Sequence, residues 1–396
     1  MTNTDNEKIN ELLTRGVEEV IEADLLHKKL KSGKVLRIKL GIDPTSPNIH
    51  IGRAVPLLKL HDFQLLGHKV VLIIGDFTGV IGDTSDKDAE RPMLSAETIT
   101  TNMEKYVEQA GKIINIDKCE IHYNSEWLKK LNYYEICEQA NVFSLNNFIA
   151  RENIRKRLDD GKRVSLREVL YPLMQGYDSV AIKADVELGG TDQRFNLLAG
   201  RDLQKHFGQD TQDIITNPLI EGIDGRKMSS SWGNVINLTD SARDMFGKIM
   251  SINDDLIIKY FELATRVPMT EIKNFQKQLS SDTNPRDIKI KLAFEIVKFY
   301  HSDEIAKAEQ KIFENTFSKG EIPTDIEEII LEDGQSAMQV LVAKSIVSSG
   351  SEWRRLVESG AVKTADGNKI DDINFTPTEP TVLKIGKKIF VKIIPK

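Results

Sequence analysis

Cysteine is scarce in this chain. Its 396 residues include only Cys119 and Cys137, which lie far apart and form no CxxC pattern. This excludes a disulfide scaffold and a thiolate zinc site, and a reducing cytoplasm fits the composition. The histidines show no HxH or HExxH spacing, so we expect no metal site.

Long apolar runs are also missing. No stretch of roughly 18 apolar residues occurs, so we expect no helix that spans a membrane. The first residues, MTNTDNEKINELLTRG, are polar and mixed in charge, which predicts that no signal peptide is present. The hydrophobic content of 40% is nevertheless enough to build cores, which excludes global disorder.

The chain has no excess of positive charge. Its formal net charge is −6, from 54 Lys and Arg against 60 Asp and Glu, which argues against a protein that coats nucleic acid non-specifically. The charge is uneven, because residues 335–396 hold 10 basic and 6 acidic side chains and carry +4, which leaves −10 for the rest. This asymmetry indicates that a polyanion is held at one end.

The length predicts two or three domains, and the first third has the pattern of an α/β fold. Strand, helix and strand patterns at 35–43, 50–67 and 69–77 predict a βαβ unit and a parallel sheet. We expect residues 98–164 to be a mostly helical insertion. Further strands are predicted at 180–188 and 214–220.

Helical spacing dominates from Asp240 to about Glu314, which predicts an α-helical domain. The acidic segment 321–336 contains proline and glycine and is interpreted as a linker. Residues 337–396 then predict a small α+β module, with two helical stretches followed by short strands.

One motif, PTSPNIHIGR at Pro44–Arg53, joins a buried strand to a helix. Ligands of open α/β sheets bind at the carboxyl ends of strands, beside helix N-termini. His50 could therefore donate to a phosphate, and Gly52 leaves room for a flat ring to stack on the backbone. The alternative is an ordinary helix start with an incidental histidine.

A second motif, EGIDGRKMSSSWGN at Glu221–Asn234, places Lys227 in a loop rich in glycine and serine. Such a loop can deliver a cation and hydroxyls to developing phosphate charge. Taken alone, a solvated loop with an ordinary lysine is the simpler interpretation.

Three shorter segments complete the pattern. In YPLMQGYD, Tyr171, Gln175 and Asp178 share one helical face, and an exposed polar face is the alternative. The glycines of LGGTDQ (188–193) permit close approach of the backbone to a ligand. The charged segment TSDKDAER (84–91) would by itself be a solvated loop.

Together, the two longer motifs resemble the HIGH and KMSKS signatures of class I aminoacyl-tRNA synthetases. The resemblance covers nearly the whole chain and extends to the tyrosyl-tRNA synthetases, with GDFTG at Gly75–Gly79 pointing to a bacterial branch. It implies a Rossmann-like catalytic domain at 1–234 with a helical insertion at about 98–164. An α-helical domain at 235–325 and an S4-like RNA-binding domain at 335–396 would follow.

The resemblance also implies roles for individual residues. Tyrosine would be bound by Lys39, Gly41, Asp43, Asp83, Tyr171, Gln175, Asp178 and Gln193. ATP would be bound by His50, Gly52, Gly190, Asp192, Lys227, Met228, Ser229 and Ser230. The catalytic set would be Thr45, His50, Arg53, Lys87, Arg91, Lys227 and Ser230, and RNA would contact Lys344, Arg354, Arg355 and Lys363.

Three positions depart from the family pattern. Arg53 replaces the last histidine of HIGH, and Ser230 replaces the second lysine of KMSKS. Stabilisation of phosphate charge would then depend more on Lys87, Arg91, Arg226 and Arg53. Lys39 stands where many relatives have a tyrosine that contacts the phenol oxygen, so discrimination would depend mainly on Asp178.

The implied activity is the two-step attachment of L-tyrosine to tRNA(Tyr) through tyrosyl-adenylate. ATP with Mg²⁺ would be a substrate complex, with no tightly bound cofactor. The resemblance also implies a homodimer in the cytoplasm with no membrane partner. A tryptophanyl-tRNA synthetase and a non-enzymatic RNA-binding protein derived from a synthetase are the alternatives.

Overall fold

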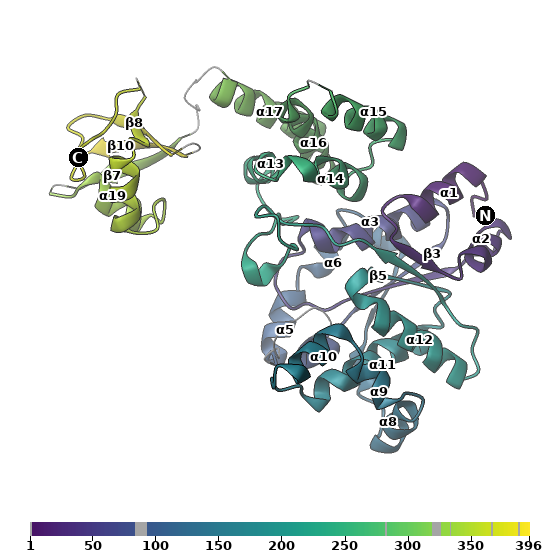
Figure 1. Ribbon diagram of the computed structural model, residues 1–396. Coiled ribbons are helices and arrows are strands. Elements are labelled where there is room, and N and C mark those ends of the chain that lie inside the picture. Colours follow the sequence, from purple (N-terminus) through teal and green to yellow (C-terminus); the bar gives the residue numbers. More distant parts are fainter. Residues whose placement is uncertain are drawn as a thin grey trace. The chain divides into compact units, whose positions relative to one another are not determined.

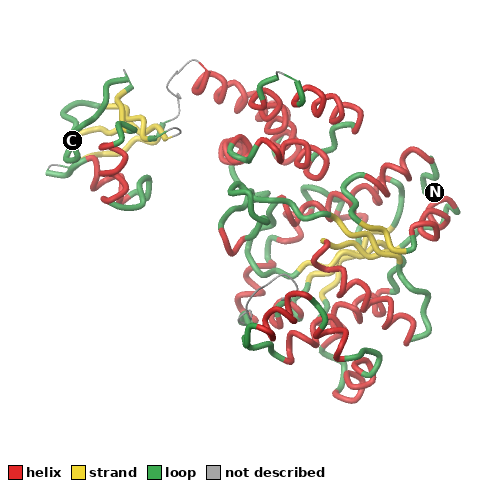
Figure 2. Tube along the Cα trace, viewed as in Figure 1, coloured by secondary structure: helices red, strands yellow, loops and turns green. Residues whose placement is uncertain are grey.

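The computed structural model describes residues 2–83, 93–281, 283–318, 326–332, 334–365, 367–386 and 389–396. The chain divides into two compact units, Met1–Ala306 and Lys307–Lys396. Figures 1 and 2 show the helices and strands of each unit.

The first unit is built on a six-stranded sheet with the order β1-β6-β5-β2-β3-β4. Its strands are β1 (Glu19–Ile21), β2 (Arg37–Ile42), β3 (Lys69–Ile74), β4 (Glu120–Tyr123), β5 (Val186–Gly190) and β6 (Asp213–Asn217). All neighbours pair in parallel except β1, which runs antiparallel to β6. Five of the six residues of β3 are buried, as expected for a parallel strand covered on both faces.

Helices cover both faces of this sheet, with α3 on one side and α11 and α12 on the other (Figure 1). The predicted βαβ unit is confirmed as β2, α3 and β3. The helices of this region are α1 (Asn6–Thr14), α2 (Ala23–Lys31), α3 (Ile51–Leu65), α4 (Thr78–Ile81), α5 (Ala96–Met103), α6 (Tyr106–Ala110), α7 (Ser125–Leu128), α8 (Tyr133–Ala140), α9 (Leu145–Ile149), α10 (Glu152–Asp159), α11 (Leu166–Ile182) and α12 (Arg194–His206).

One expectation about this region was wrong. The predicted strand at 180–188 is the end of α11 followed by the shorter strand β5, because a short apolar run fits a buried helix as well as a strand. Lys183 ends the helix in the left-handed conformation, with φ of 51°. Residues 98–164 are mostly helical, as predicted, and they also contain β4, which pairs with β3 at the sheet edge. Its four residues are too few to give a clear alternating pattern.

The helical pattern after Asp240 is confirmed. The helices are α13 (Ala242–Met250), α14 (Ile257–Ala264), α15 (Met269–Leu279), α16 (Pro285–Tyr300) and α17 (Asp303–Ser318). Asn284 caps α16 and Pro285 occupies its first turn, where a missing N–H has no cost. Most of this region lies within the first compact unit.

The second unit contains a four-stranded sheet with the order β7-β10-β9-β8. Its elements are β7 (Glu327–Leu331), α18 (Ala337–Ala343), α19 (Gly350–Glu358), β8 (Val362–Thr364), β9 (Thr381–Ile385) and β10 (Ile389–Pro395). Trp353 is fully buried in its core and donates its indole N–H to the Ile373 carbonyl at 2.8 Å.

The interpretation of 321–336 as a linker was wrong for Glu327–Leu331. This segment is β7, which pairs in parallel with β10. Two of its residues, Ile329 and Leu331, enter the core of the module. Its acidic character comes from exposed side chains.

Candidate functional site

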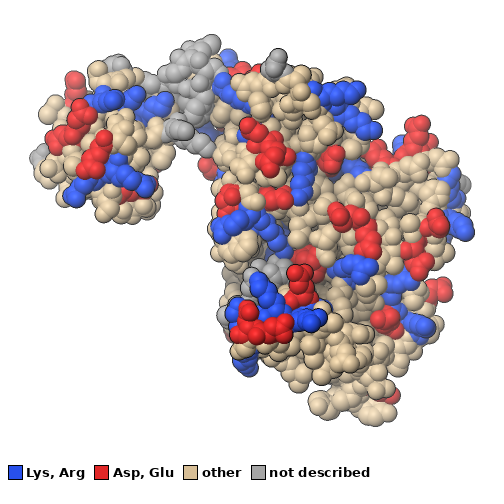
Figure 3. Space-filling model, in the orientation of Figure 1, with Lys and Arg blue, Asp and Glu red and all other residues tan. Residues whose placement is uncertain are grey.

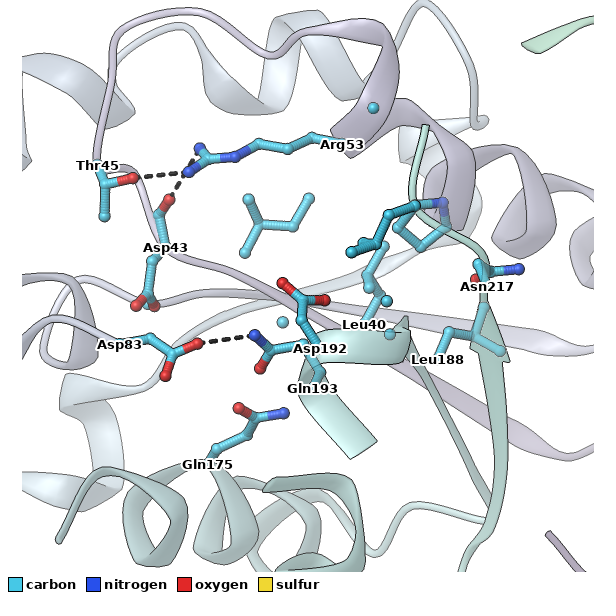
Figure 4. Close-up of a pocket in the computed structure, with 18 of the residues that line it drawn as sticks. Leu40, Asp43, Thr45, Arg53, Asp83, Gln175, Leu188, Asp192, Gln193 and Asn217 are labelled. Atoms are coloured by element: carbon cyan, nitrogen blue, oxygen red, sulfur yellow. Dashed lines mark hydrogen bonds between the residues drawn. The ribbon is translucent and has the colours of Figure 1, made fainter. Parts of the chain in front are cut away.

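A pocket opens at the carboxyl ends of the central strands, and 31 of the described residues line it. Most of them come from β2, β5, the start of α3, the middle of α11 and the loop before α13. Figure 4 shows Asp43, Arg53, Asp83, Gln175, Asp192 and Gln193 converging on this space. The predicted tyrosine- and ATP-binding residues line this pocket, with the exception of Lys39.

His50 is the N-cap of α3, and its Nδ1 accepts from the Arg53 backbone N–H at 3.3 Å. This contact leaves the Nε2 atom as the protonated nitrogen. Burial, together with the charges of Arg53 and Lys227, lowers the pKa of His50 to about 3, so the ring is neutral at pH 7. A neutral ring at the start of a helix can donate one hydrogen bond to an anion.

Gly52 lies against the His50 ring. A Cβ atom at residue 52 would stand 3.1 Å from His50 Nδ1 and 3.2 Å from an Ile220 methyl carbon. A side chain at residue 52 would therefore crowd the His50 ring at the first turn of α3.

The loop at 44–49 is held by three polar side chains of α5 and α6. Asn102 donates to the Pro44 carbonyl at 2.9 Å, and Tyr106 donates to the Ser46 carbonyl at 2.7 Å. Gln109 donates to the Pro47 carbonyl and accepts from the Ile49 N–H, at 3.0 and 2.8 Å. These bonds satisfy backbone groups of a loop that has no secondary structure of its own.

Arg53 is fixed on the pocket wall by the same region. Its guanidinium donates to Thr45 Oγ1 at 2.7 Å, to the Tyr106 hydroxyl at 2.8 Å and to the Asp43 carbonyl at 3.3 Å. Figure 4 shows the side chain reaching toward Thr45. The sequence analysis did not identify Tyr106 or its neighbours, since polar residues on a helix usually face solvent.

The loop that carries the second motif, Glu221–Asn234, lies over the first turn of α3. Met228 Sδ accepts from the Gly52 N–H at 3.3 Å, and the hydroxyls of Ser230 and Ser46 are 3.3 Å apart. Lys227 forms an ion pair with Asp192 at 3.0 Å. The two motifs, far apart in sequence, therefore form one wall.

The side chain of Arg226 has different partners from that of Lys227. It pairs with Asp224 at 2.6 Å and lies over the Trp232 ring at 4.8 Å. Unlike Lys227, it is not among the residues that line the pocket in the described part of the chain.

The buried end of the pocket presents Asp178, whose two oxygens accept from the wall. Trp127 Nε1 donates to Oδ1 at 2.7 Å, and Asn124 Nδ2 donates to Oδ2 at 3.3 Å. Burial raises the pKa of Asp178 to about 7, while the charge of Lys39 and these hydrogen bonds act against the rise. Neither Trp127 nor Asn124 was identified from the sequence.

Two further carboxylates line the pocket. Asp43 accepts from the Tyr171 hydroxyl at 2.8 Å and from the Thr78 hydroxyl at 2.7 Å. Burial raises the pKa of Asp43 to about 6 despite these bonds. Asp83 accepts from Gln193 at 2.7 Å. A cluster of carboxylates at one end of a pocket suits a cationic ammonium group.

Lys39 lies behind the pocket rather than in it. Within the described residues it is not part of the lining, and it forms a buried ion pair with Glu187 at 2.8 Å. Lys87 and Arg91 lie outside the described residues.

The predicted RNA-binding residues lie in the second unit. Lys344, Arg354 and Arg355 are exposed around α18 and α19. Lys363 is on β8, directly opposite Lys384 of β9. This unit therefore presents basic side chains on its helices and on its sheet.

Among the described residues, no group of three or more His, Cys, Asp or Glu side chains could hold a metal ion. The same residues include no helix with the length and apolar character needed to cross a membrane.

Comparisons with known proteins identify the family to which this chain is similar. A family model for class I tRNA synthetases (W and Y) matches residues 31–318. The tyrosine--tRNA ligase of Thermotoga maritima is 44% identical over 394 residues, which cover 98% of both chains. That of Shewanella oneidensis is 46% identical and covers 96% of this chain and 97% of its own.

A solved structure has the same fold. A C-terminally truncated mitochondrial tyrosyl-tRNA synthetase from Coccidioides posadasii matches with a TM-score of 0.64 and 25% identity. The match covers 78% of this chain and 92% of the fungal one.

Proposed function

The chain belongs to the class I tRNA synthetases of the tryptophan and tyrosine family, and we propose on this basis that it joins L-tyrosine to tRNA(Tyr). ATP is the second substrate, with Mg²⁺ as its counter-ion. The observation that carries the choice of tyrosine is Asp178, a carboxylate at the buried end of the pocket that is 3% exposed.

Asp178 accepts the phenol hydroxyl in this proposal. A site built to pair with that hydroxyl rejects phenylalanine, because the buried carboxylate would lose its partner; tyrosyl-tRNA synthetase is itself a standard example of this effect. Tyr171, Gln175, Asp43, Asp83 and Gln193 surround the ammonium and carboxylate end. The relatives that are 44% and 46% identical carry the tyrosine name, which favours tyrosine over tryptophan.

The first reaction step needs no protein nucleophile. The tyrosine carboxylate attacks the α-phosphate of ATP, which gives tyrosyl-adenylate and releases pyrophosphate. Negative charge grows on the phosphate oxygens during this step, and preorganised donors lower its energy. His50, as a neutral Nε2–H donor, serves this purpose together with Thr45 and Lys227.

Arg53 compensates for the missing second lysine of the loop. Ser230 carries no charge, whereas Arg53 holds a permanent cation beside Thr45, fixed by the 2.7 and 2.8 Å bonds described above. Asp192 and Gly190 bind the nucleotide, and Lys227 leaves Asp192 to meet the phosphates. Lys87 and Arg91 bind the pyrophosphate group and stabilise its charge.

The second step transfers the tyrosyl group to tRNA. A ribose hydroxyl of the tRNA attacks the carbonyl of the adenylate and releases AMP. Residues 235–325 and the S4-like module at 335–396 bind the tRNA, with Lys344, Arg354, Arg355 and Lys363 on its phosphates. The module's charge of +4 supports this role.

The active form is a homodimer. Four large apolar side chains between α8 and the start of α11 are well exposed, namely Tyr133 (83%), Tyr134 (71%), Leu145 (58%) and Leu166 (71%). In Figure 3 the part of the first unit that carries α8 shows few charged side chains. Large apolar side chains exposed in this way support an interface at this region. A monomer by light scattering at working concentration would contradict the homodimer.

The protein works in the cytoplasm in this proposal, since Cys119 and Cys137 are both free thiols.

The activity is tested by ATP–pyrophosphate exchange with tyrosine, tryptophan or no amino acid. Tyrosine alone should drive exchange. Exchange driven by tryptophan instead would favour the other branch of the family. No exchange with either amino acid would support an RNA-binding protein without chemistry and would refute the proposal.

A further inference from the structure

A closed cluster of polar side chains lies directly behind the tyrosine pocket. Lys39 on β2 and Glu187 on β5 are 0% and 1% exposed, and their charged groups are 2.8 Å apart. Ser179 on α11 and Gln212, just before β6, complete the cluster, and both are 0% exposed. Two strands, one helix and the residue before β6 therefore meet at one ion pair.

The hydrogen bonds in this cluster are saturated. The ammonium of Lys39 donates to Glu187, to the Gln175 carbonyl at 2.8 Å and to Ser179 Oγ at 2.7 Å, which uses all three of its protons. The carboxylate of Glu187 accepts from Lys39 and Gln175 on one oxygen and from Ser179 and Gln212 on the other.

The packing of α12 leaves space for these contacts. Gly200 faces the cluster, and a Cβ atom at this residue would lie 2.6 Å from Gln212 Nε2 and 3.0 Å from Ser179 Oγ. The neighbouring helix thus approaches the ion pair closely only because residue 200 has no side chain.

The bonds from Lys39 reach the turn of α11 that carries the recognition residues. Gln175 and Ser179 lie on either side of Asp178 in this turn, and Gln175 also lines the pocket (Figure 4). Glu187 holds the Gln175 side chain at 3.2 Å, so the pair controls both the backbone and a side chain of the turn.

We propose that the buried Lys39–Glu187 pair is a positioning device for tyrosine recognition, which fixes the 175–179 turn so that Gln175 and Asp178 face the substrate. This inference rests on the proposed function and adds residues that touch no substrate. Lys39 acts through α11 and not through the phenol oxygen.

Two physical arguments support positioning over simple stabilisation. A buried ion pair is weak evidence for stability, because removing two charges from water offsets much of their attraction. The pair also affects charge at the recognition site, since Lys39 lowers the pKa of Asp178 and Glu187 raises it. The other groups facing Asp178 are Trp127 and Asn124, which donate to it, and Tyr171, which is also in the pocket.

The test uses purified full-length protein and tyrosine-dependent pyrophosphate exchange. The unmodified protein is measured first, so that absence of tyrosine-dependent exchange refutes the proposed function separately. In Lys39→Met, we expect the KM for tyrosine at pH 7.5 to rise about tenfold, which corresponds to one hydrogen bond with a charged group. The KM for ATP should stay within twofold, and the preference for tyrosine over phenylalanine should fall about tenfold.

The pH profile separates positioning from a general loss of structure. Without Lys39, the pH at which kcat/KM for tyrosine reaches half its maximum should move upward, because Asp178 ionises less easily. A matched control is Lys59→Met, which removes a buried lysine of α3 that donates to the Leu12 carbonyl and is not among the described residues that line the pocket. Its tyrosine KM and pH profile should not change.

A second variant keeps the test decisive if Lys39→Met does not fold. Glu187→Gln preserves the size of the side chain but adds a donor where Gln175 and Gln212 need an acceptor. Its tyrosine KM should rise severalfold. A folded Lys39→Met or Glu187→Gln protein with tyrosine KM and phenylalanine discrimination within twofold of the original would overturn the inference.

The double variant Lys39→Met/Glu187→Gln neutralises both charges and gives a further criterion. If the pair positions the turn, the melting temperature recovers relative to Lys39→Met while the tyrosine KM stays raised. If both quantities return to their original values, the pair has only a structural role and the inference is wrong.

Discussion

Replacing Asp178 by asparagine removes the charge at the buried end of the pocket while keeping the size of the side chain. In the structure both carboxylate oxygens accept hydrogen bonds, from Trp127 at 2.7 Å and from Asn124 at 3.3 Å. Asparagine offers one acceptor oxygen, so its amide NH₂ group would face one of these donors. The variant therefore loses the charge that we propose accepts the phenol hydroxyl, together with one contact of the wall.

The size of the effect follows from these bonds. A hydrogen bond to a charged group contributes about 1.5–3 kcal/mol, which corresponds to about 10- to 150-fold in kcat/KM for tyrosine. The measurement belongs at pH 8, because the pKa of Asp178 is about 7 and the carboxylate is then mostly ionised. Phenylalanine has no hydroxyl, so its kcat/KM should change by less than threefold or rise.

The assay is pyrophosphate exchange with each amino acid at pH 8, with folding checked by circular dichroism. Asp202→Asn on α12 is the matched control, because Asp202 is exposed and is not among the described residues that line the pocket. If folded Asp178→Asn kept its ratio of tyrosine to phenylalanine activity within twofold, Asp178 would not be the acceptor of the phenol hydroxyl.

Four other outcomes are expected. The kcat/KM for tyrosine of the original protein should rise between pH 6 and pH 8 as Asp178 ionises, and a flat profile would contradict this. Tyr106→Phe removes the hydrogen bonds to the loop at 44–49 and to Arg53, so adenylate formation should slow by about tenfold with the tyrosine KM unchanged. A normal rate would mean that the conformation of this loop does not depend on Tyr106. Lys227→Ala should lower kcat of exchange at saturating ATP by at least about tenfold, or roughly 1.4 kcal/mol of barrier; full activity would remove Lys227 from the catalytic set. Trp353→Ala should destabilise the second unit by about 3–5 kcal/mol, reducing tRNA charging but not exchange; unchanged charging would argue against tRNA binding there.

The residues of the pocket that could be predicted from the sequence are those that belong to recognisable motifs. His50, Lys227 and Asp178 occur in segments that each allow an ordinary structural explanation but together match a family pattern, and all three line the pocket. The βαβ unit was also predictable, since the apolar runs of β2 and β3 allow few other structures.

The supporting side chains could not be predicted in this way. Asn102, Tyr106 and Gln109 are polar residues on short helices, and their spacing is equally typical of a face exposed to water. The partnership of Lys39 with Glu187 depends on two strands becoming neighbours in the sheet, a fact of tertiary structure. A short strand with two leading glutamates, such as β7, also resembles a linker until its partner strand is known.

The pairing of β7 with β10 has a consequence for the order in which the second unit folds. β7 is the first strand of this sheet to be synthesised, yet it pairs with β10, which itself lies between β7 and β9. The ribosome must therefore make β8 and β9 before β7 has a partner. At a synthesis rate of about 5–20 residues per second, β7 remains unpaired for several seconds until β10 has been made. A chain interrupted before Ile389 would expose the apolar side of β7 and β9, so protein quality control should recognise such fragments readily.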